Sequence, residues 1–189
     1  MEVNIYNTDK KYQIIYADPP WAFNSKKTGG SMTSGSEYQY KSVMTIDKLK
    51  KMPIAEIACD NCALVMWYVG SQPQEALDLV KAWGFTVRTM NGFIWDKLTK
   101  HGLPHFGMGY YTRAGAECAI IATKGKPSKL VKDHSVRQVR KSVVGKHSEK
   151  PHKFYGDIER LFGDVPRIEL FARNTKVGWD CFGNEINEG

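Results

Sequence analysis

Five segments rich in apolar residues are spaced along the chain, at residues 12–18, 63–69, 85–95, 117–123 and 167–173. They contain many Val, Ile, Leu and aromatic side chains, and the most apolar of them lack the polar alternation of a half-exposed strand. Short apolar runs of this kind are typical of strands buried on both faces of a sheet. The pattern therefore predicts a sheet whose strands occupy these five segments.

Stretches with helical spacing lie between the predicted strands. Residues 45–58 have a partial apolar face with Thr45 as a suitable N-cap, and Pro53 should kink or divide this helix. Residues 74–83 show a second helical pattern, and Pro151 is placed to occupy the first position of a third helix. Strands that alternate with helices in this way predict an α/β fold with a mostly parallel sheet and helices on both of its faces.

Three segments show no helical or strand period. Residues 22–44 are rich in Gly, Ser, Thr and Lys, and they are long enough to act as a mobile lid. Residues 97–115 are predicted to be a polar loop that contacts a partner or reads the target, and residues 124–150 a basic loop. Because no repeat or linker divides the chain, we expect residues 1–189 to form a single domain.

The basic residues are unevenly distributed. The chain carries a net charge of +7, and residues 124–150 contain nine Lys and Arg side chains against two acidic ones, so this stretch accounts for the whole excess. A solvated loop is one interpretation, but charge concentrated beside a candidate active site favours a surface that binds a polyanion. The side chains predicted to contact phosphates are Lys129, Lys132, Arg137 and Arg140.

Composition also excludes several classes of protein. No apolar run approaches the roughly 18 residues that cross a membrane, so we expect no membrane partner. Met1 is followed by Glu2 and polar residues, so we expect no signal peptide and a location in the cytoplasm, or in the host cytoplasm if the protein is viral. Cys59 and Cys62 form a C-x-x-C pair without a second pair at zinc spacing. The cysteines are therefore expected to be reduced and structural, and no metal site is predicted.

The candidate chemistry lies where the first strand ends in Asp18-Pro19-Pro20-Trp21. Proline has no N–H and a fixed φ, so the strand has to stop at Asp18, at the edge where α/β sheets bind ligands. The carboxylate can accept one N–H of a planar amine and a proline carbonyl the other, while Trp21 offers a surface for a base to stack on. The alternative is a Pro-Pro turn with a tryptophan that only packs.

These four residues resemble the signature of the MT-A70-type adenine-N6 methyltransferases. Further blocks follow in the family's order across about residues 12–186, namely Met66-Trp67-Tyr68-Val69-Gly70, Ile94-Trp95, Ala116-Glu117-Cys118 and Glu169-Leu170-Phe171-Ala172-Arg173. The resemblance implies a Rossmann-like class I methyltransferase domain, permuted so that the catalytic motif precedes the cofactor motif. It also implies direct SN2 transfer of a methyl group from S-adenosylmethionine to the N6 amine of adenine, without a metal or a covalent intermediate.

The resemblance further assigns roles to individual residues. Asp18, Pro19, Pro20 and Trp21 correspond to the catalytic group, and Tyr40 joins Trp21 in stacking the base. Lys150 corresponds to a lysine that meets the carboxylate of the cofactor. The positions that the resemblance places at the cofactor are Asp18, Lys150, Glu169, Arg173, Asn184 and Glu185, the last of which is often Gln in the family.

DNA is the favoured substrate, because this compact chain lacks the long extra regions of the animal RNA enzymes and is similar to stand-alone bacterial or bacteriophage members. The same reaction on RNA stays open, and so does a non-catalytic nucleic-acid-binding subunit, although inactive subunits of the family lose the tetrad that this chain keeps. A nicotinamide oxidoreductase is a weaker alternative, since Gly107-Met108-Gly109 follows no predicted strand and opens no helix. A homodimer stays open as the oligomeric state.

Overall fold

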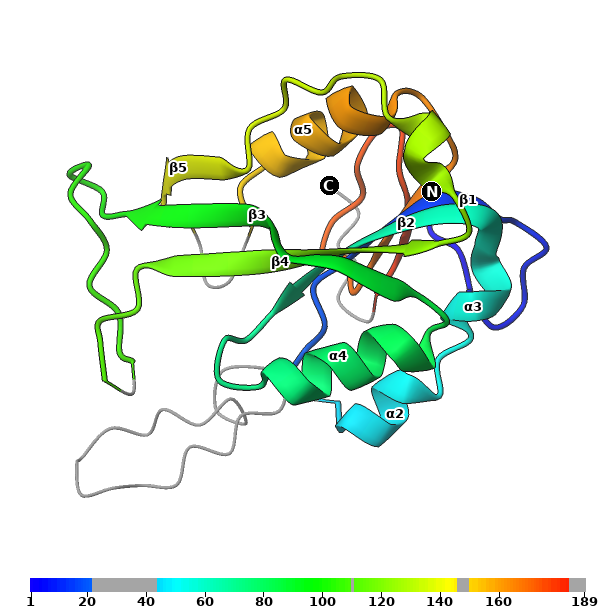
Figure 1. The fold of residues 1–189 in the computed structure, drawn as a ribbon, viewed down its shortest axis with the longest axis horizontal. Helices are drawn as coiled ribbons and strands as arrows, with labels where there is room; N and C mark the ends of the chain where they lie inside the picture. Colours follow the sequence, from blue (N-terminus) through cyan, green and yellow to red (C-terminus); the bar gives the residue numbers. More distant parts are fainter. Residues whose placement is uncertain (22–43, 110, 146–149, 184–189) are drawn as a thin grey trace.

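The computed structural model describes residues 1–21, 44–109, 111–145 and 150–183. Within this part of the chain, seven strands form one sheet in the order β5-β3-β4-β2-β1-β6-β7 (Figure 1). The strands are β1 (Tyr12–Ala17), β2 (Ala58–Tyr68), β3 (Thr86–Leu98), β4 (Ala116–Lys124), β5 (Val139–Val143), β6 (Arg167–Leu170) and β7 (Asp180–Phe182). The helices are α2 (Ile46–Lys50), α3 (Ile54–Ile57), α4 (Pro73–Ala82), the 3-10 helix η1 (Pro127–Leu130) and α5 (Lys153–Phe162).

Strand direction decides which residues meet at each edge of the sheet. β1 is parallel to both β2 and β6, β6 is parallel to β7, and β3 is parallel to β5. Of the seven strands in the described residues, β4 alone runs the other way, because the chain turns back after β3 without a crossover helix. The prediction of a mostly parallel sheet is confirmed. The start of β4 therefore lies at the same edge as the carboxyl ends of the other strands, and this edge is called the active edge below.

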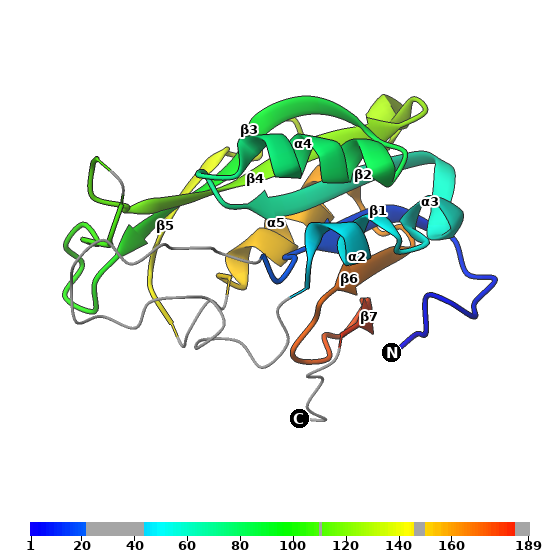
Figure 2. The ribbon, with the colours of Figure 1, turned by 90° about the horizontal axis from the view of Figure 1, so that it is seen from below.

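Helices cover both faces of the sheet, as predicted. Helix α5 lies on one face, and α2, α3 and α4 lie on the other (Figures 1 and 2). Successive residues of β1 belong to opposite cores, since Ile14 and Tyr16 share a buried cluster with residues of α5, whereas Ile15 and Ala17 share one with residues of α4. A strand buried on both faces explains the continuous apolar run in the sequence.

Most helix predictions are confirmed, with one correction. The Thr45 side chain accepts a hydrogen bond from the Lys48 N–H and caps α2, and Pro53 divides the predicted helix into α2 and α3. Pro151 does not occupy the first helical position, because α5 begins at Lys153 with His152 as its N-cap. The Pro151 carbonyl instead accepts the Phe154 N–H at 3.0 Å, so Pro151 lies in the turn that leads into the helix.

The predicted basic loop at residues 124–150 is a second correction, because it contains η1 and the strand β5. β5 is an edge strand that pairs with residues 94–98 of β3. Its charged residues and its half-exposed pattern conceal it from an apolar count, as is common for edge strands. The predicted loop at residues 97–115 is also partly ordered, with bridges between Leu98 and Pro104 and between Gly107 and Ala114.

Three other expectations concern the lid, membrane-spanning helices and the cysteine pair. The predicted lid lies outside the described residues except for Met44, which forms a bridge with Trp21. None of the helices in the described residues has the length and apolar character needed to cross a membrane. Cys59 and Cys62 both lie on β2, and side chains three positions apart on an extended strand point to opposite faces. Burial raises the pKa of the Cys62 thiol to about 12, which makes it unreactive.

Candidate active site

Asp18 follows the last residue of β1, at the active edge, where the sequence placed it. Its carboxylate accepts a hydrogen bond from the Lys150 ammonium at 2.7 Å. The Asp18 side chain keeps 31% of its surface exposed, whereas Lys150 keeps 9%. Burial among other polar groups raises the pKa of Asp18, and the positive charge of Lys150 opposes this rise. Asp18 is thus a hydrogen-bond acceptor that a ligand can reach, and the buried Lys150 ammonium fixes its carboxylate in place.

Lys150 lies between two carboxylates, because Glu117 Oε2 is 3.1 Å from its ammonium. Glu117 belongs to the start of β4, and it is also bonded by Lys97 from the carboxyl end of β3. Side chains from four separate segments therefore alternate in charge, in the order Lys97, Glu117, Lys150 and Asp18. This set is called the charge chain below.

The charge chain favours the ionised forms of its two central members, Lys150 and Glu117. Burial alone would lower the pKa of Lys150, but the two neighbouring carboxylates outweigh it and the pKa is raised. Burial alone would raise the pKa of Glu117, but Lys150 and Lys97 outweigh it and the pKa is lowered. Both groups therefore remain charged at neutral pH. Glu117 stands within a family-like block of the sequence, but no role was predicted for it or for Lys97.

Aromatic rings support the charge chain. The Lys150 ammonium lies 5.4 Å from the centroid of the Trp67 ring, and the Lys97 ammonium lies 4.9 Å from that of Trp95. The Trp67 indole N–H donates to the Tyr16 hydroxyl at 2.7 Å, which fixes the ring. Cations over aromatic faces are stabilised by the ring quadrupole, more strongly when water is excluded. These contacts hold the lysines without using their hydrogen-bonding capacity.

Glu169 lies on β6 opposite Tyr16 of β1, on the same side of the sheet as the charge chain. Its carboxylate accepts the Tyr155 hydroxyl hydrogen at 2.7 Å. Burial raises the pKa of Glu169 to about 7; the Tyr155 hydrogen bond opposes this rise and the negative charge of Asp18 adds to it. The predicted cofactor residue is therefore placed beside Asp18, with a carboxyl group that titrates near neutral pH.

Arg173 lies close enough for its positive charge to lower the pKa of Asp18. The chain reaches it through Phe171, which has φ of 64° and turns the backbone after β6. The Ala172 N–H then donates to the Phe182 carbonyl at 3.0 Å, and a Cβ on Gly183 would lie 2.1 Å from the Ala172 carbonyl oxygen. Only glycine allows this approach, which brings the end of β7 next to the Arg173 segment. Asn184, Glu185 and Tyr40 lie outside the described residues.

The rest of the tetrad is held by backbone hydrogen bonds and by the core. The Pro19 carbonyl accepts the Trp21 N–H at 2.8 Å, and the Pro20 carbonyl accepts the Met44 N–H at 3.3 Å. The Trp21 indole N–H donates to the Trp67 carbonyl at 3.2 Å, and the Trp21 side chain is buried. A carbonyl oxygen has two lone pairs, so either proline can accept one more hydrogen bond. The stacking role of Trp21 stays a prediction.

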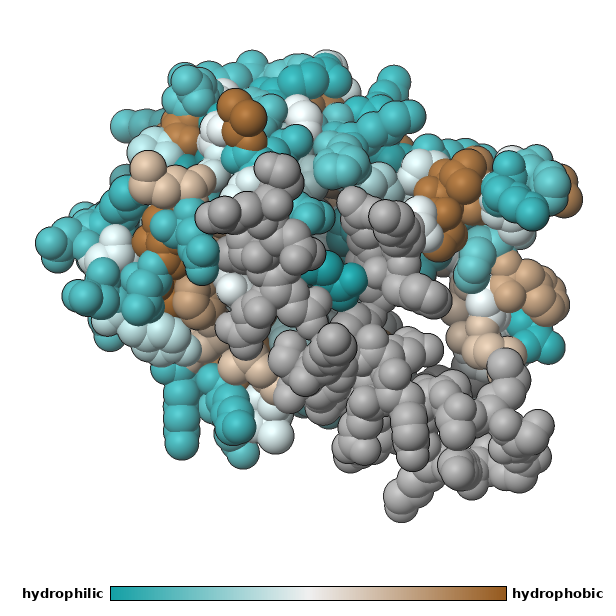
Figure 3. Space-filling model, turned by 180° about the vertical axis from the view of Figure 1, so that it is seen from behind, coloured by the Kyte–Doolittle hydropathy of each residue, from teal (hydrophilic) through white to brown (hydrophobic). Residues whose placement is uncertain are grey.

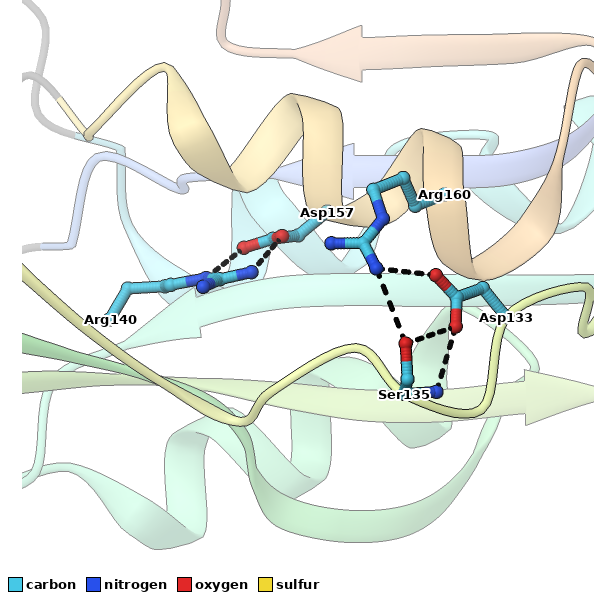
Figure 4. Close-up of polar contacts among 5 residues, drawn as sticks. All are labelled: Asp133, Ser135, Arg140, Asp157 and Arg160. Carbon is cyan, nitrogen blue, oxygen red and sulfur yellow. Dashed lines mark hydrogen bonds and ion pairs between the residues drawn. The ribbon is translucent and has the colours of Figure 1, made fainter.

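The four cations predicted to contact phosphates do not form one surface. β4 runs away from the active edge, so Lys129 and Lys132, which follow it closely, lie near the opposite edge. Arg137 is exposed and precedes β5, whose direction brings the chain back to the active edge. Arg140 is half-buried and bonds the Asp157 carboxylate of α5 (Figure 4). The four side chains therefore lie in different parts of the structure and do not share one phosphate-binding surface.

Figure 4 shows two ion pairs that join residues 133–140 to α5. Arg140 makes two hydrogen bonds to Asp157, which is 4% exposed, and Arg160 donates to Asp133 at 2.5 Å. Asp133 also accepts the Ser135 backbone N–H at 2.8 Å. The charge of Arg140 is thus compensated by a buried carboxylate, which gives this residue a structural role in the described chain.

The chain is similar to known methyltransferases along nearly its whole length. The MT-A70 family model matches residues 12–185. The type II methyltransferase M.MunI of Mycoplasma sp is 35% identical, and the alignment covers 94% of this chain and 78% of that protein.

Two human relatives are more distant. The N(6)-adenosine-methyltransferase catalytic subunit METTL3 is 26% identical over 94% of this chain, and the N(6)-adenine-specific methyltransferase METTL4 is 27% identical over 96% of it. The alignments cover 28% and 39% of these two proteins, so the chain spans well under half of each. The family model and the bacterial relative agree with the motif order, and the chain belongs to the MT-A70 family.

Proposed function

We propose that this protein methylates the N6 amine of adenine in DNA, with S-adenosylmethionine as the methyl donor. Its family and the enzymes that it resembles make it an adenine-N6 methyltransferase. The type II methyltransferase M.MunI from Mycoplasma, which this chain covers for 78% of its length, supports DNA as the substrate. The observation that carries the proposal is the reachable Asp18 carboxylate at the active edge, followed by two prolines and backed by buried Lys150.

Asp18 and a proline carbonyl orient the target amine in this proposal. The carboxylate accepts one N–H of the N6 group and a second lone pair of the Pro19 or Pro20 carbonyl accepts the other. The amine is thereby held with its lone pair directed out of the ring plane, in line for attack on a methyl group. The nitrogen becomes acidic once it carries the methyl group, so its proton can pass to water afterwards. Asp18 therefore works by position and charge, and need not be a strong base.

Residues of the active edge fit the polar groups of the donor. S-adenosylmethionine supplies an electrophilic methyl group when it is bound. Lys150 has three N–H donors, and within the described residues two of them face Asp18 and Glu117. The remaining donor suits a carboxylate of the methyl donor, at a site whose charges are already balanced. Glu169 and Arg173 flank the same edge and offer an acceptor and a cation for its other polar groups.

DNA is the proposed partner, and the proposed location in the cytoplasm follows from where the DNA lies. A DNA-modifying enzyme acts where the genome lies, which in a bacterial cell or one infected by a bacteriophage is the cytoplasm. Arg137, Lys129 and Lys132 remain predicted phosphate contacts, while Arg140 is compensated by Asp157. Light scattering of the purified protein decides between a monomer and a homodimer.

Transfer of a tritiated methyl group tests the function directly. The purified protein is incubated with labelled S-adenosylmethionine and with native DNA, heat-denatured DNA or RNA, and the labelled nucleosides are identified by chromatography. We expect N6-methyldeoxyadenosine from DNA. If label appears only in RNA, the substrate is RNA and not DNA. If the protein neither binds nor turns over S-adenosylmethionine, it is a non-catalytic subunit.

A further inference from the structure

The described residues of the segment 99–115 form an arm that projects from the active edge, far beyond the body of the sheet (Figure 1). Of this arm, residues 99–109 and 111–115 are described. Gly107 and Ala114 exchange backbone hydrogen bonds of 2.9 and 3.1 Å, and the Thr99 N–H donates to the Leu103 carbonyl at 2.8 Å. A Cβ at Gly107 would lie 2.5 Å from the Ala114 carbonyl oxygen, so the two halves of the arm are closely paired.

The arm carries large apolar side chains that the rest of the protein does not cover. Leu103 is 63% exposed, Phe106 73%, Met108 76% and Tyr111 103%. Figure 3 shows apolar side chains on the arm, where it stands away from the body of the molecule. Apolar groups gathered on a surface mark a site of interaction, because leaving them in water is unfavourable. The arm is therefore built to contact something outside the chain.

The charge of the arm indicates the nature of its partner. Residues 98–116 contain Lys100, His101, His105 and Arg113 and no Asp or Glu. The Arg113 guanidinium lies 4.7 Å from the centroid of the Phe106 ring, so a cation and an aromatic face are presented together. A polyanion with flat apolar faces inside it matches this combination, and a nucleic-acid duplex is such a partner.

The base of the arm is part of the active edge. Its two ends run into Lys97 and Glu117, which bond each other and continue through Lys150 to Asp18. An adenine in a duplex has to leave the base stack before it can reach a pocket at Asp18. Proteins that open base steps insert apolar side chains such as Phe, Leu and Met between them. The arm presents Phe106 and Met108 from the place where such an opening is needed.

We propose that the arm is a wedge for duplex DNA, which inserts Phe106 and Met108 into the base stack beside the target adenine and so favours the extruded base. This inference rests on the proposed DNA methylation. Lys100 and Arg113 would contact the phosphates on either side of the opened step. The wedge is needed only where a base pair has to be opened, so its contribution depends on the strand state of the substrate.

The first test compares native and heat-denatured samples of the same DNA. The double variant Phe106→Gln/Met108→Gln should lose about ten- to a hundredfold of the methylation rate on native DNA and stay within about twofold of the unsubstituted protein on denatured DNA. The control is Leu77→Gln, which changes an exposed apolar residue on α4 and should leave both rates unchanged. If the unsubstituted protein methylates neither form, the proposed function fails, whatever the role of the arm.

A second measurement does not depend on activity with single strands. The target site is identified from the methylated DNA, and 2-aminopurine replaces the target adenine in a short duplex. Its fluorescence should rise when the unsubstituted protein binds, and rise several-fold less at saturation with the double variant. Equal fluorescence and equal rates on native DNA would overturn the wedge. Equal losses on native and denatured DNA, with a homodimer in light scattering that the variant dissociates, would instead make the arm an interface between two copies.

Discussion

Removing the cation at the centre of the charge chain should destabilise the protein in a pH-dependent way. In Lys150→Met, the Asp18 and Glu117 carboxylates lose the ammonium that lies 2.7 and 3.1 Å from them. Removing one partner of a buried ion pair costs about 3 to 5 kcal/mol. Because each carboxylate keeps 31% of its side-chain surface exposed, water can partly solvate it, and we expect about 3 kcal/mol. For a domain of this size the midpoint of thermal unfolding should fall by about 6 to 12 °C.

The pH dependence identifies the cause of this loss. Burial already raises the pKa of Asp18, and without Lys150 it should rise further. An acid with a raised pKa binds its proton more tightly in the folded state, so the folded state loses stability as the pH rises through that pKa. The deficit of Lys150→Met should therefore be largest at pH 8 and should shrink toward pH 5, where a carboxyl takes up a proton. Thermal unfolding followed by circular dichroism at both pH values measures it.

The matched control is Lys153→Met, which removes an exposed lysine at the start of α5 and should change the midpoint by less than about 2 °C. The same Lys150 variant should bind S-adenosylmethionine more weakly by about 1.5 to 3 kcal/mol in calorimetry, the value of a charge-assisted hydrogen bond. A variant that unfolds at the wild-type temperature at pH 8, or that shows the same deficit at pH 5, would refute the reasoning. Unchanged affinity for S-adenosylmethionine would show that Lys150 is not part of the site that binds this methyl donor.

Four further substitutions test the site and the basic residues 124–150. Asp18→Ala should lose about 3 kcal/mol or more of transition-state stabilisation, roughly 150-fold in the rate of tritium transfer, with a much smaller loss of S-adenosylmethionine affinity in calorimetry. The wild-type protein should lose thermal stability as the pH rises toward 7, because the Glu169 carboxyl, with a pKa of about 7, becomes charged in the folded state there. In Glu169→Gln this loss should be smaller. Arg140→Gln should cost about 2 to 3 kcal/mol in denaturant unfolding because it leaves Asp157 buried without its cation. It should also keep the wild-type salt dependence of DNA binding, whereas Arg137→Gln should lower the slope of log K against log salt by about 0.9 if Arg137 contacts one phosphate.

The chain's own sequence determined the position of Asp18 and the layers of the fold. Proline ends a strand whatever surrounds it, because its missing N–H and fixed φ are local properties, so the acid had to lie at a strand's carboxyl end. The apolar runs likewise identified the central strands, since a strand covered on both faces cannot carry polar side chains in its middle. Pro53 and Thr45 gave the division and the start of the first helices for similar local reasons.

Strand direction was decided only by the tertiary structure. The residues around Glu117 have the same apolar pattern in a parallel as in an antiparallel strand, because the period of side chains does not depend on the direction of pairing. The reversal of β4 brings Glu117 to Lys150 and completes the charge chain. The same reversal carries the start of the basic stretch to the opposite edge. A count of charges along the chain could not show that these residues lie at opposite edges of the sheet.

The partners of charged side chains were also decided by the fold. Arg140 was counted with the free cations, but it meets Asp157, which is 17 positions away and nearly fully buried. β5 was hidden for a related reason, since an edge strand exposes alternate side chains and its charges resemble those of a loop. Hydrogen bonds and ion pairs between distant segments depend on how the segments pack, so only the folded chain shows which charges are compensated and which remain available to a ligand.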